Sequence, residues 1–495
     1  MLKAILRLFL LTCFLGAVSL SSESPISPKL QQVLKNERNQ KISVVVYLKG
    51  SLRISEIANR FSSLNHRQSK NQAITLIKKN ADYHQASIRK VIDQMQVQNR
   101  AQNARYFWLV NAIALNTDAK FIQQLSRRKD VAAIVLNEKI KCIPKQKLSK
   151  PSRELKKDPR SFVNSDLVAD EDGFFATGFE ITVAVLDTGL ADAQRAEFFI
   201  HPDETSFVIE EPFINDLEGH GTHVAGLIAS ETFGVAKDAT ILPIKVLDQF
   251  GDGFIVDITL GVEFAAERAD ILNMSLGIPA LSENRKERLL VEKACKNAIK
   301  LGRTLVAAAG NSGPDKKTID SPALVSKVFA VGALTLDVPN TEGQFPGLPA
   351  IFSSRGPKGP DFMAPGVDIS SLALDPTNNP TIFSGTSQSA PIVAGICAQY
   401  LEFINILNDI AAADVKKLER EALGKNVFKI LTKSASHGFA KRNITGKGYI
   451  DSLSAITGLL NRLKIIEDFI QLDSPVRSAY RSIKENKRLK VQQKR

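Results

Sequence analysis

Cysteine is scarce in this sequence, which has four among 495 residues. Cys13 lies in the apolar N-terminal stretch, and Cys142 lies near the end of a basic leader, residues 23–147. The rest of the chain, its body, therefore holds only Cys295 and Cys397. At most one disulfide can therefore form in the body. The two thiols either pair in an oxidising compartment or stay free and buried, and the sequence leaves both alternatives open.

Long apolar runs are also lacking after the first residues. Residues 1–22 begin with Lys3 and Arg7, continue as an apolar stretch and end among small residues, which predicts a cleaved signal peptide. The apolar part is too short for a membrane span, and we expect no spanning run later in the chain. We therefore expect an exported protein, extracellular or periplasmic, with no stable membrane span.

Acidic residues are few at both ends of the chain. Residues 23–147 hold about 23 Lys and Arg against 8 Asp and Glu, whereas residues 148–460 hold about 30 against 40. Residues 461–495 are basic again, with about 10 against 4. A basic leader facing an acidic body favours docking of one on the other, so we expect no nucleic-acid partner.

The leader, residues 23–147, shows the pattern of a small α+β unit. Apolar residues recur at helical spacing over residues 70–103, and the other elements are short. The expected elements are a strand at 41–50, one or two helices at 70–103, a strand at 107–117, a helix at 119–130 and a strand at 131–140. The next residues, 148–177, begin within a charged, proline-containing stretch at 145–160 and are expected to be a linker that contains the maturation cleavage region.

Apolar strands alternate with helical patterns between about residues 178 and 400. This alternation predicts an α/β fold with a mostly parallel sheet covered by helices on both faces. Reacting groups in such folds collect at the carboxyl ends of strands and at helix N-termini. The expected strands are 181–187, 241–247, 271–275, 304–309 and 328–331, and the expected helices are 220–230, 257–269, 283–301 and 387–400.

Three separate stretches place reactive side chains beside turns. The sequence FSGTSQSAPIVAG, residues 383–395, predicts a tight turn and then a helix with Ser387 at its N-terminus, where unpaired N–H groups suit a developing oxyanion. ITVAVLDTGLAD predicts a buried strand that ends at Asp187. GHGTHVAGLIAS predicts His220 at the start of a helix of small residues. Together they supply the side chains of a Ser-His-Asp triad, in the order Asp, His, Ser.

These three motifs, in this order, resemble the subtilase family of subtilisin-like serine proteases. The resemblance implies that Ser387 is the nucleophile, His220 the general base and Asp187 the carboxylate that orients the imidazole. It also implies that the first histidine of HGTH acts and that His223, one helical turn later, is a packed structural residue. The leader resembles the family's inhibitory propeptide, which makes self-processing an expectation; an unrelated leader domain is the alternative.

The resemblance extends to the groups that would bind substrate. In VAAAGNSGP, Asn311 corresponds to the family's side-chain donor for the oxyanion. NMSLG resembles the strand and turn on which substrate is laid out as an added strand. The implied pocket walls are Ser275, Leu276 and Gly277 on one side and Ala308, Ala309 and Gly310 on the other. Asp320 stands near the expected pocket floor, so an acidic side chain there would favour Lys or Arg before the scissile bond.

Two other functions are compatible with parts of the pattern. A non-catalytic secreted binding protein on a subtilase scaffold is one, and the complete set of triad residues argues against it. An aspartic protease is the other, because DTG occurs there too, but that site requires a second such carboxylate and the sequence has no second DTG or DSG. The expected partners are protein and peptide substrates and the chain's own propeptide. We expect the protein to be a monomer.

We expect no cofactor and no metal in the chemistry itself. Structural calcium is common in subtilases, but no complete carboxylate cluster can be assigned, and the acidic residues 248–257 read equally well as a solvated loop. The catalytic domain is expected to span residues 178–460. Residues 461–495 form a basic tail, partly helical or mobile, and a solvated tail is favoured over a binding role.

Overall fold

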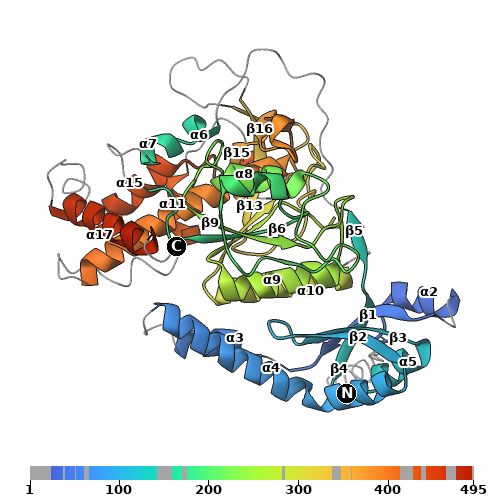
Figure 1. Cartoon of the computed structure of the whole chain (residues 1–495). Helices are drawn as coiled ribbons and strands as arrows, with labels where there is room; N and C mark the ends of the chain where they lie inside the picture. Colours follow the sequence, from blue (N-terminus) through green and yellow to red (C-terminus); the bar gives the residue numbers. More distant parts are fainter. Residues whose placement is uncertain are drawn as a thin grey trace, which may run out of the picture.

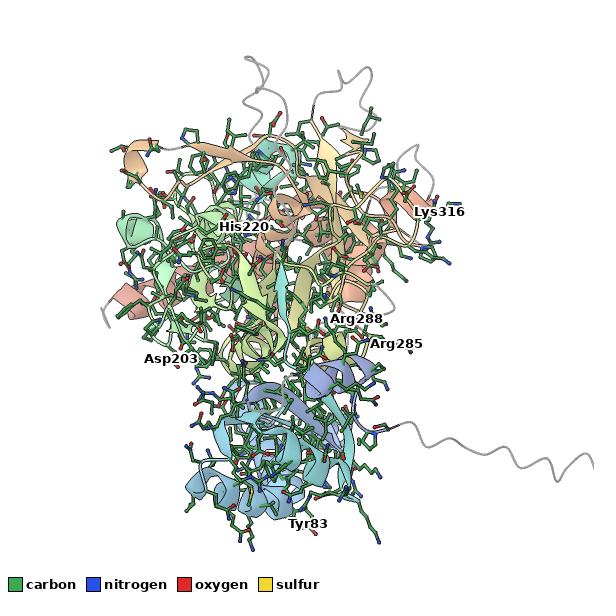
Figure 2. All side chains as sticks on the ribbon, turned by 90° about the vertical axis from the view of Figure 1, so that its right-hand side faces the viewer. Tyr83, Asp203, His220, Arg285, Arg288 and Lys316 are labelled. Atoms are coloured by element: carbon green, nitrogen blue, oxygen red, sulfur yellow. The ribbon has the colours of Figure 1, made fainter. Side chains whose placement is uncertain are left out.

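The structure is a computed structural model, and it describes most of the chain. The described residues are 24–36, 40–50, 52–60, 66–141, 159–169, 176–280, 285–336, 347–357, 359–378, 380–412, 427–435, 442–463 and 475–492. The predicted signal peptide, Cys142 and most of the predicted linker lie outside these residues. Figure 1 shows a smaller N-terminal domain below a larger one, and Figure 2 shows Tyr83 at the far end of the smaller domain and His220 in the larger.

The N-terminal domain is an antiparallel sheet with helices against it, as the alternating pattern predicts. The strand order is β2-β3-β1-β4. One face of β1 packs on Ile88 and Ile92 of the long helix α4 in a core of its own. The elements are β1 (Ile42–Leu48), β2 (Ala101–Phe107), β3 (Ala112–Thr117), β4 (Val131–Leu136), α2 (Pro28–Asn36), α3 (Ile54–Arg60), α4 (His66–Val97) and α5 (Ala119–Ser126).

Three expectations for this domain were wrong in detail. The strand expected at 131–140 is two strands, β4 and β5 (Lys139–Lys141). The apolar run at 107–117 is a hairpin rather than one strand, because β2 ends at Phe107 and β3 begins only at Ala112. The turn keeps its apolar Leu109 because that side chain is buried against the larger domain. The helix expected to reach residue 103 ends at Val97, and β2 follows it.

The larger domain is built on a nine-stranded sheet with the path β14-β13-β12-β11-β6-β9-β7, and β15 and β8 pair beside it. Its centre is parallel, which confirms the predicted α/β fold. The strands are β6 (Thr182–Asp187), β7 (Phe199–Ile200), β8 (Thr205–Ser206), β9 (Thr240–Lys245), β11 (Ile271–Met274), β12 (Thr304–Ala308), β13 (Phe329–Thr335), β14 (Leu348–Pro349) and β15 (Phe362–Pro365).

Helices cover both faces of this sheet, because alternate strand residues are apolar on both sides. Val183 and Val185 face a core shared with α8 (His220–Ala229) and α11 (Thr386–Ala412). Ala184 and Leu186 face a second core shared with α9 (Ile255–Arg268) and α10 (Arg285–Lys300). The second core extends into the N-terminal domain, so α9 and α10 lie between the sheet and that domain (Figure 1).

Part of the predicted linker belongs to the larger domain instead. The short helices α6 (Pro159–Phe162) and α7 (Ser165–Ala169) flank Val163, which is fully buried in the first core. The backbone N–H of Ser452 donates to the Val163 carbonyl at 2.8 Å, and Gln399 Nε2 donates to the Ser165 carbonyl at 3.1 Å. The described part of residues 148–177 is therefore folded onto the larger domain.

The basic tail is not simply solvated, which corrects the favoured expectation. Helix α17 (Pro475–Gln492) packs along α11, and Tyr480 and Lys484 on it are buried. The Lys484 ammonium lies 2.6 Å from a carboxylate oxygen of Glu402 on α11. The other Glu402 oxygen accepts the backbone N–H groups of residues 177–179. The tail thus fastens the start of the domain to its central helix.

The long apolar helix α11 and the two cysteines of the larger domain are all buried in its cores. Residues 386–407 of α11 are long and apolar enough to span a membrane, contrary to the expectation that no later run would be. However, 89% of this apolar stretch is buried within the protein. Cys295 and Cys397 are free and buried, in the second and the first core respectively. Burial in apolar surroundings raises the pKa of both thiols.

Candidate active site

Asp187 and His220 meet at the carboxyl end of the central strand. Asp187 is the last residue of β6 and His220 the first of α8, and both side chains are buried. His220 Nδ1 lies 2.7 Å from Asp187 Oδ1, which also accepts the Thr188 N–H at 2.9 Å. The contact leaves Nε2 as the ring nitrogen that could act on a substrate or nucleophile.

Asp216, which the sequence reasoning missed, fixes the start of α8. Its Oδ1 accepts the Gly219 N–H at 2.8 Å, and its Oδ2 accepts both the N–H and the hydroxyl of Thr222. Burial opposes ionisation of Asp216, but these hydrogen bonds outweigh it and lower the pKa. A buried anion therefore sits at the positive end of the helix that presents His220. The signal in the sequence was the position of Asp216 shortly before the first turn of α8, where a carboxylate can accept backbone N–H groups.

His223 has the packed environment that the resemblance implies. Its side chain is completely buried, and Nε2 lies 3.1 Å from the Ile369 carbonyl. Its ring stacks on Phe383 with the centroids 4.6 Å apart. His220 of the HGTH motif contacts the Asp187 carboxylate, whereas His223 contacts a backbone carbonyl and an aromatic ring, as expected of a packed structural residue.

Ser387 lies in the first turn of α11, which packs against α8. Its hydroxyl donates to the Ser275 carbonyl at 3.1 Å, and the Ser275 hydroxyl donates to the Ser387 carbonyl at 2.9 Å. Pro391 lies four residues on, inside the helix. Because proline has no N–H, the Ser387 carbonyl lacks its helical donor and is available to Ser275.

Asn311 and the Ser387 backbone face the same small space. Asn311 Oδ1 accepts the N–H and the hydroxyl of Thr386, each at 3.0 Å, which orients the amide. A Cβ added to Gly385 would lie 3.1 Å from Asn311 Nδ2, 3.7 Å from the Ser387 nitrogen and 3.1 Å from the acceptor Gln388 Oε1. Two donors thus border a space that the absence of a side chain at Gly385 keeps open. Such an arrangement suits a developing oxyanion.

The predicted pocket residues lie at the ends of two neighbouring parallel strands. Ser275, Leu276 and Gly277 follow β11, and Ala309 and Gly310 follow Ala308, the last residue of β12.

Asp320 lies beside this second wall. Its backbone N–H donates to the Ala309 carbonyl at 3.0 Å, and a Cβ added to Gly310 would lie 2.5 Å from Asp320 Oδ2. Burial raises the pKa of Asp320 to about 6, which the Ala280 N–H opposes.

Lys245, also missed, lies behind the Asp187 turn. It pairs with Asp187 in the register of β9 and β6, and its side chain is completely buried. Its ammonium donates to the Thr188 carbonyl at 2.6 Å and lies 2.8 Å from Glu211 Oε2. The single charge within the apolar run ILPIKVL was the signal for it. In the described part of the chain, no group of three or more His, Cys, Asp or Glu side chains is placed to hold a metal ion.

The sequence is similar to known proteases over about half of its length. A profile of the subtilase family matches residues 178–442. Serine protease AprX of Bacillus subtilis is 36% identical over 290 residues, which are 50% of this chain and 62% of that protein. Thermostable alkaline protease of Halalkalibacterium halodurans is 34% identical over 307 residues, 56% of this chain and 76% of that protein. Subtilisin DY of Bacillus licheniformis is 38% identical over 232 residues, 45% and 77% respectively. The chain belongs to the subtilase family of subtilisin-like serine proteases.

Proposed function

We propose that the chain is an exported serine endopeptidase made as a zymogen, with Ser387, His220 and Asp187 as its catalytic triad. The observation that carries the proposal is the 2.7 Å contact of the buried Asp187 and His220, with Ser387 held at the start of the neighbouring helix. A hydroxyl becomes a useful nucleophile only when a base removes its proton. Asp187 would keep the imidazole in the required tautomer and stabilise its protonated form.

The reaction follows from these positions. The Ser387 hydroxyl, which donates to Ser275 in the structure, turns toward His220, gives up its proton and attacks the substrate's carbonyl carbon. Asn311 Nδ2 and the Ser387 N–H donate to the oxyanion. His220 then gives the proton to the leaving amine as the C–N bond breaks, and an ester of Ser387 remains. Water, deprotonated by His220, hydrolyses this ester and restores the serine.

Stable binding of the N-terminal domain, which inhibition would require, is supported by its contacts with α9 and α10 of the larger domain. Glu263 on α9 is buried, and its Oε1 accepts the Leu109 N–H at 2.5 Å. Asn297 Nδ2 donates to the Leu109 carbonyl at 2.8 Å, and Lys78 forms a 2.7 Å ion pair with Glu267. The ion pair joins the basic leader to the acidic body, in agreement with the charge distribution along the chain.

Substitution of Ser387 by alanine tests the proposal. We expect the variant to fold, to resist labelling by a serine-directed fluorophosphonate, and to remain unprocessed when expressed alone. Ser389→Ala is the matched control, because Ser389 lies on the same helix and donates to the Ala364 carbonyl instead. Maturation of the Ser387 variant by itself would show that self-processing is wrong. A wild-type protein that neither labels nor cleaves peptides would favour the non-catalytic alternative.

A further inference from the structure

The last described strand of the N-terminal domain is added to an edge of the larger domain. β5 (Lys139–Lys141) pairs antiparallel with β10 (Asp252–Phe254), with Lys139 opposite Phe254 and Ile140 opposite Gly253. Figure 1 shows β5 leaving the lower domain and running up beside the upper one. An extended segment added to a strand edge gains affinity from backbone hydrogen bonds and specificity from the side chains that it presents.

The receiving edge lies close to the proposed triad. The backbone N–H groups of Val246 and Leu247 donate to the Asp187 carbonyl at 2.9 and 3.2 Å. β10 folds back over this segment so closely that a Cβ added to Gly253 would lie 2.5 Å from the Val246 carbonyl oxygen. A chain paired with β10 therefore lies beside the segment that holds the Asp187 backbone.

Lys139 of β5 forms an ion pair with a carboxylate beside this edge. Lys139 Nζ lies 2.6 Å from Asp248 Oδ2. Asp248 Oδ1 accepts the N–H groups of Phe250 and Asp252, at 2.9 and 3.0 Å, so the carboxylate is fixed with its second oxygen directed at β5. The Asp248 side chain is only 11% exposed, which limits screening by solvent. Residues 248–252 are thus an ordered turn rather than the solvated loop that the sequence equally allowed.

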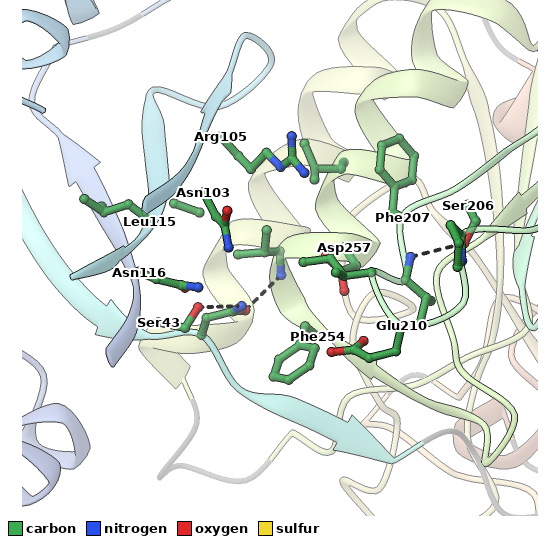
Figure 3. Close-up of a pocket in the computed structure, with 17 residues that line it drawn as sticks. Ser43, Asn103, Arg105, Leu115, Asn116, Ser206, Phe207, Glu210, Phe254 and Asp257 are labelled. Carbon is green, nitrogen blue, oxygen red and sulfur yellow. Dashed lines mark hydrogen bonds between the residues drawn. The ribbon is translucent and has the colours of Figure 1, made fainter. Parts of the chain in front are cut away.

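Other carboxylates strengthen the negative field at this position. The hydrogen bond with Asp248 raises the pKa of Lys139. Burial opposes this shift, and the charges of Asp248, Asp252 and Glu210 add to it. Glu210 lines a cavity of about 560 Å³ between the two domains, together with Phe254 and Asp257. Figure 3 shows these three side chains on one wall of the cavity, with Arg105 of the N-terminal domain across from them.

We propose that Asp248, supported by Asp252 and Glu210, is a cation-binding subsite that selects a lysine or arginine side chain in the substrate residue paired with Phe254. In the full chain Lys139 fills this subsite. The inference rests on the proposed protease function and adds a preference on the acyl side of the scissile bond, separate from any preference set by Asp320. Once the N-terminal domain leaves, the fixed Asp248 oxygen is open to a substrate cation.

The test is the Asp248→Asn variant of the processed enzyme, which keeps the oxygen that binds Phe250 and Asp252 but removes the charge. The substrates are neutral peptides in which one lysine is moved through each position on the acyl side, and the readout is kcat/KM relative to the all-alanine peptide. For wild type we expect lysine to be favoured about 5- to 10-fold at one position upstream of the scissile residue, and the variant should reduce that ratio to below about 2-fold. Asp203→Asn is the control, since Asp203 pairs with Arg268 away from β10, and its ratio should match wild type.

Two results would overturn the subsite and can be told apart from failure of the protease assignment. Wild-type cleavage of the peptides with no lysine preference upstream, or a preference that Asp248→Asn retains, would refute the subsite and leave the protease standing. If wild type hydrolyses none of the peptides, the proposed function fails and the substrate subsite fails with it.

Discussion

Ser275 and Ser387 exchange two hydrogen bonds, each hydroxyl donating to the carbonyl of the other residue. This reciprocal contact joins the end of β11, which carries one wall of the predicted pocket, to the residue proposed to attack the substrate. It is possible because Pro391 withholds the helical N–H that would otherwise compete for the Ser387 carbonyl. The proposed nucleophile is therefore positioned by the sheet as well as by its own helix.

Replacing Ser275 by alanine should loosen that position. The Ser387 carbonyl would be left without a donor inside the protein, at a cost of about 1–3 kcal/mol. We expect kcat to fall about tenfold while fluorophosphonate still labels Ser387, more slowly. Steady-state kinetics and labelling rates measure both effects. Ser389→Ala should leave kcat within about twofold of wild type, and an unchanged kcat in Ser275→Ala would show that the contact does not position the nucleophile.

Asn311→Asp tests the proposed oxyanion donor. Aspartate can still accept the two hydrogen bonds of Thr386 through one oxygen, but it replaces the Nδ2 donor by an acceptor. We expect kcat to fall by about 10²–10³ with little change in KM, because the lost donor acts on charge that develops in the transition state. Thermal unfolding should show that the fold is retained. Equal kcat in the variant and wild type would exclude Asn311 from this role.

The Asp320 carboxyl predicts a pH-dependent preference. Burial raises its pKa to about 6, so it is neutral below that pH and negative above it. The ratio of kcat/KM for Arg over Phe before the scissile bond should therefore rise as the pH increases through about 6. A ratio of rates cancels any pH effect that is common to both substrates. Asp320→Asn should give a low, pH-independent ratio, and equal cleavage of Arg and Phe peptides by wild type would reject the assignment.

Glu263 should make release of the cleaved N-terminal domain faster at higher pH. Burial raises the Glu263 pKa to about 8, despite the N–H groups of residues 108–110, whereas an exposed glutamate titrates near 4.5. The complex therefore binds a proton that the separated domains release, and its stability is lost as the pH rises from about 4.5 through 8. Dissociation rates between pH 5 and 9 measure the effect. Glu263→Gln should flatten the profile, and a wild-type rate independent of pH would contradict the prediction.

Lys484→Met should destabilise the larger domain by about 3–5 kcal/mol, because it leaves Glu402 buried without its cation. Urea unfolding of the Ser387→Ala protein, which cannot digest itself, provides the measurement. The loss should shrink toward acidic pH, since burial already raises the Glu402 pKa and the uncompensated carboxyl can take up a proton. Lys237→Met removes a half-exposed partner 3.8 Å from Glu231 and should cost less than about 0.5 kcal/mol. A loss that small for Lys484 would mean that the ion pair with Glu402 contributes little to stability.

Several features could be predicted because they depend on local pattern. The strand before Asp187 and the helix after His220 are encoded by continuous apolar and small residues, and the parallel order of the sheet follows from their alternation. The hairpin turn between Phe107 and Ala112 could not be predicted from the local pattern. Its turn is apolar because Leu109 is buried on another domain, and a pattern rule mistakes such residues for strand.

The sequence by itself determined the family, the parallel α/β fold and the short set of side chains able to do the chemistry, because each is written in a motif of a few adjacent residues. The tertiary structure decided which groups support that set. Four charged residues show this: Asp216 and Lys245 are only weakly marked in the sequence, and Asp248 and Glu402 are not marked at all. They acquire their positions only when folding brings a distant carbonyl, N–H group or ammonium within 3 Å and removes the water that would otherwise satisfy them.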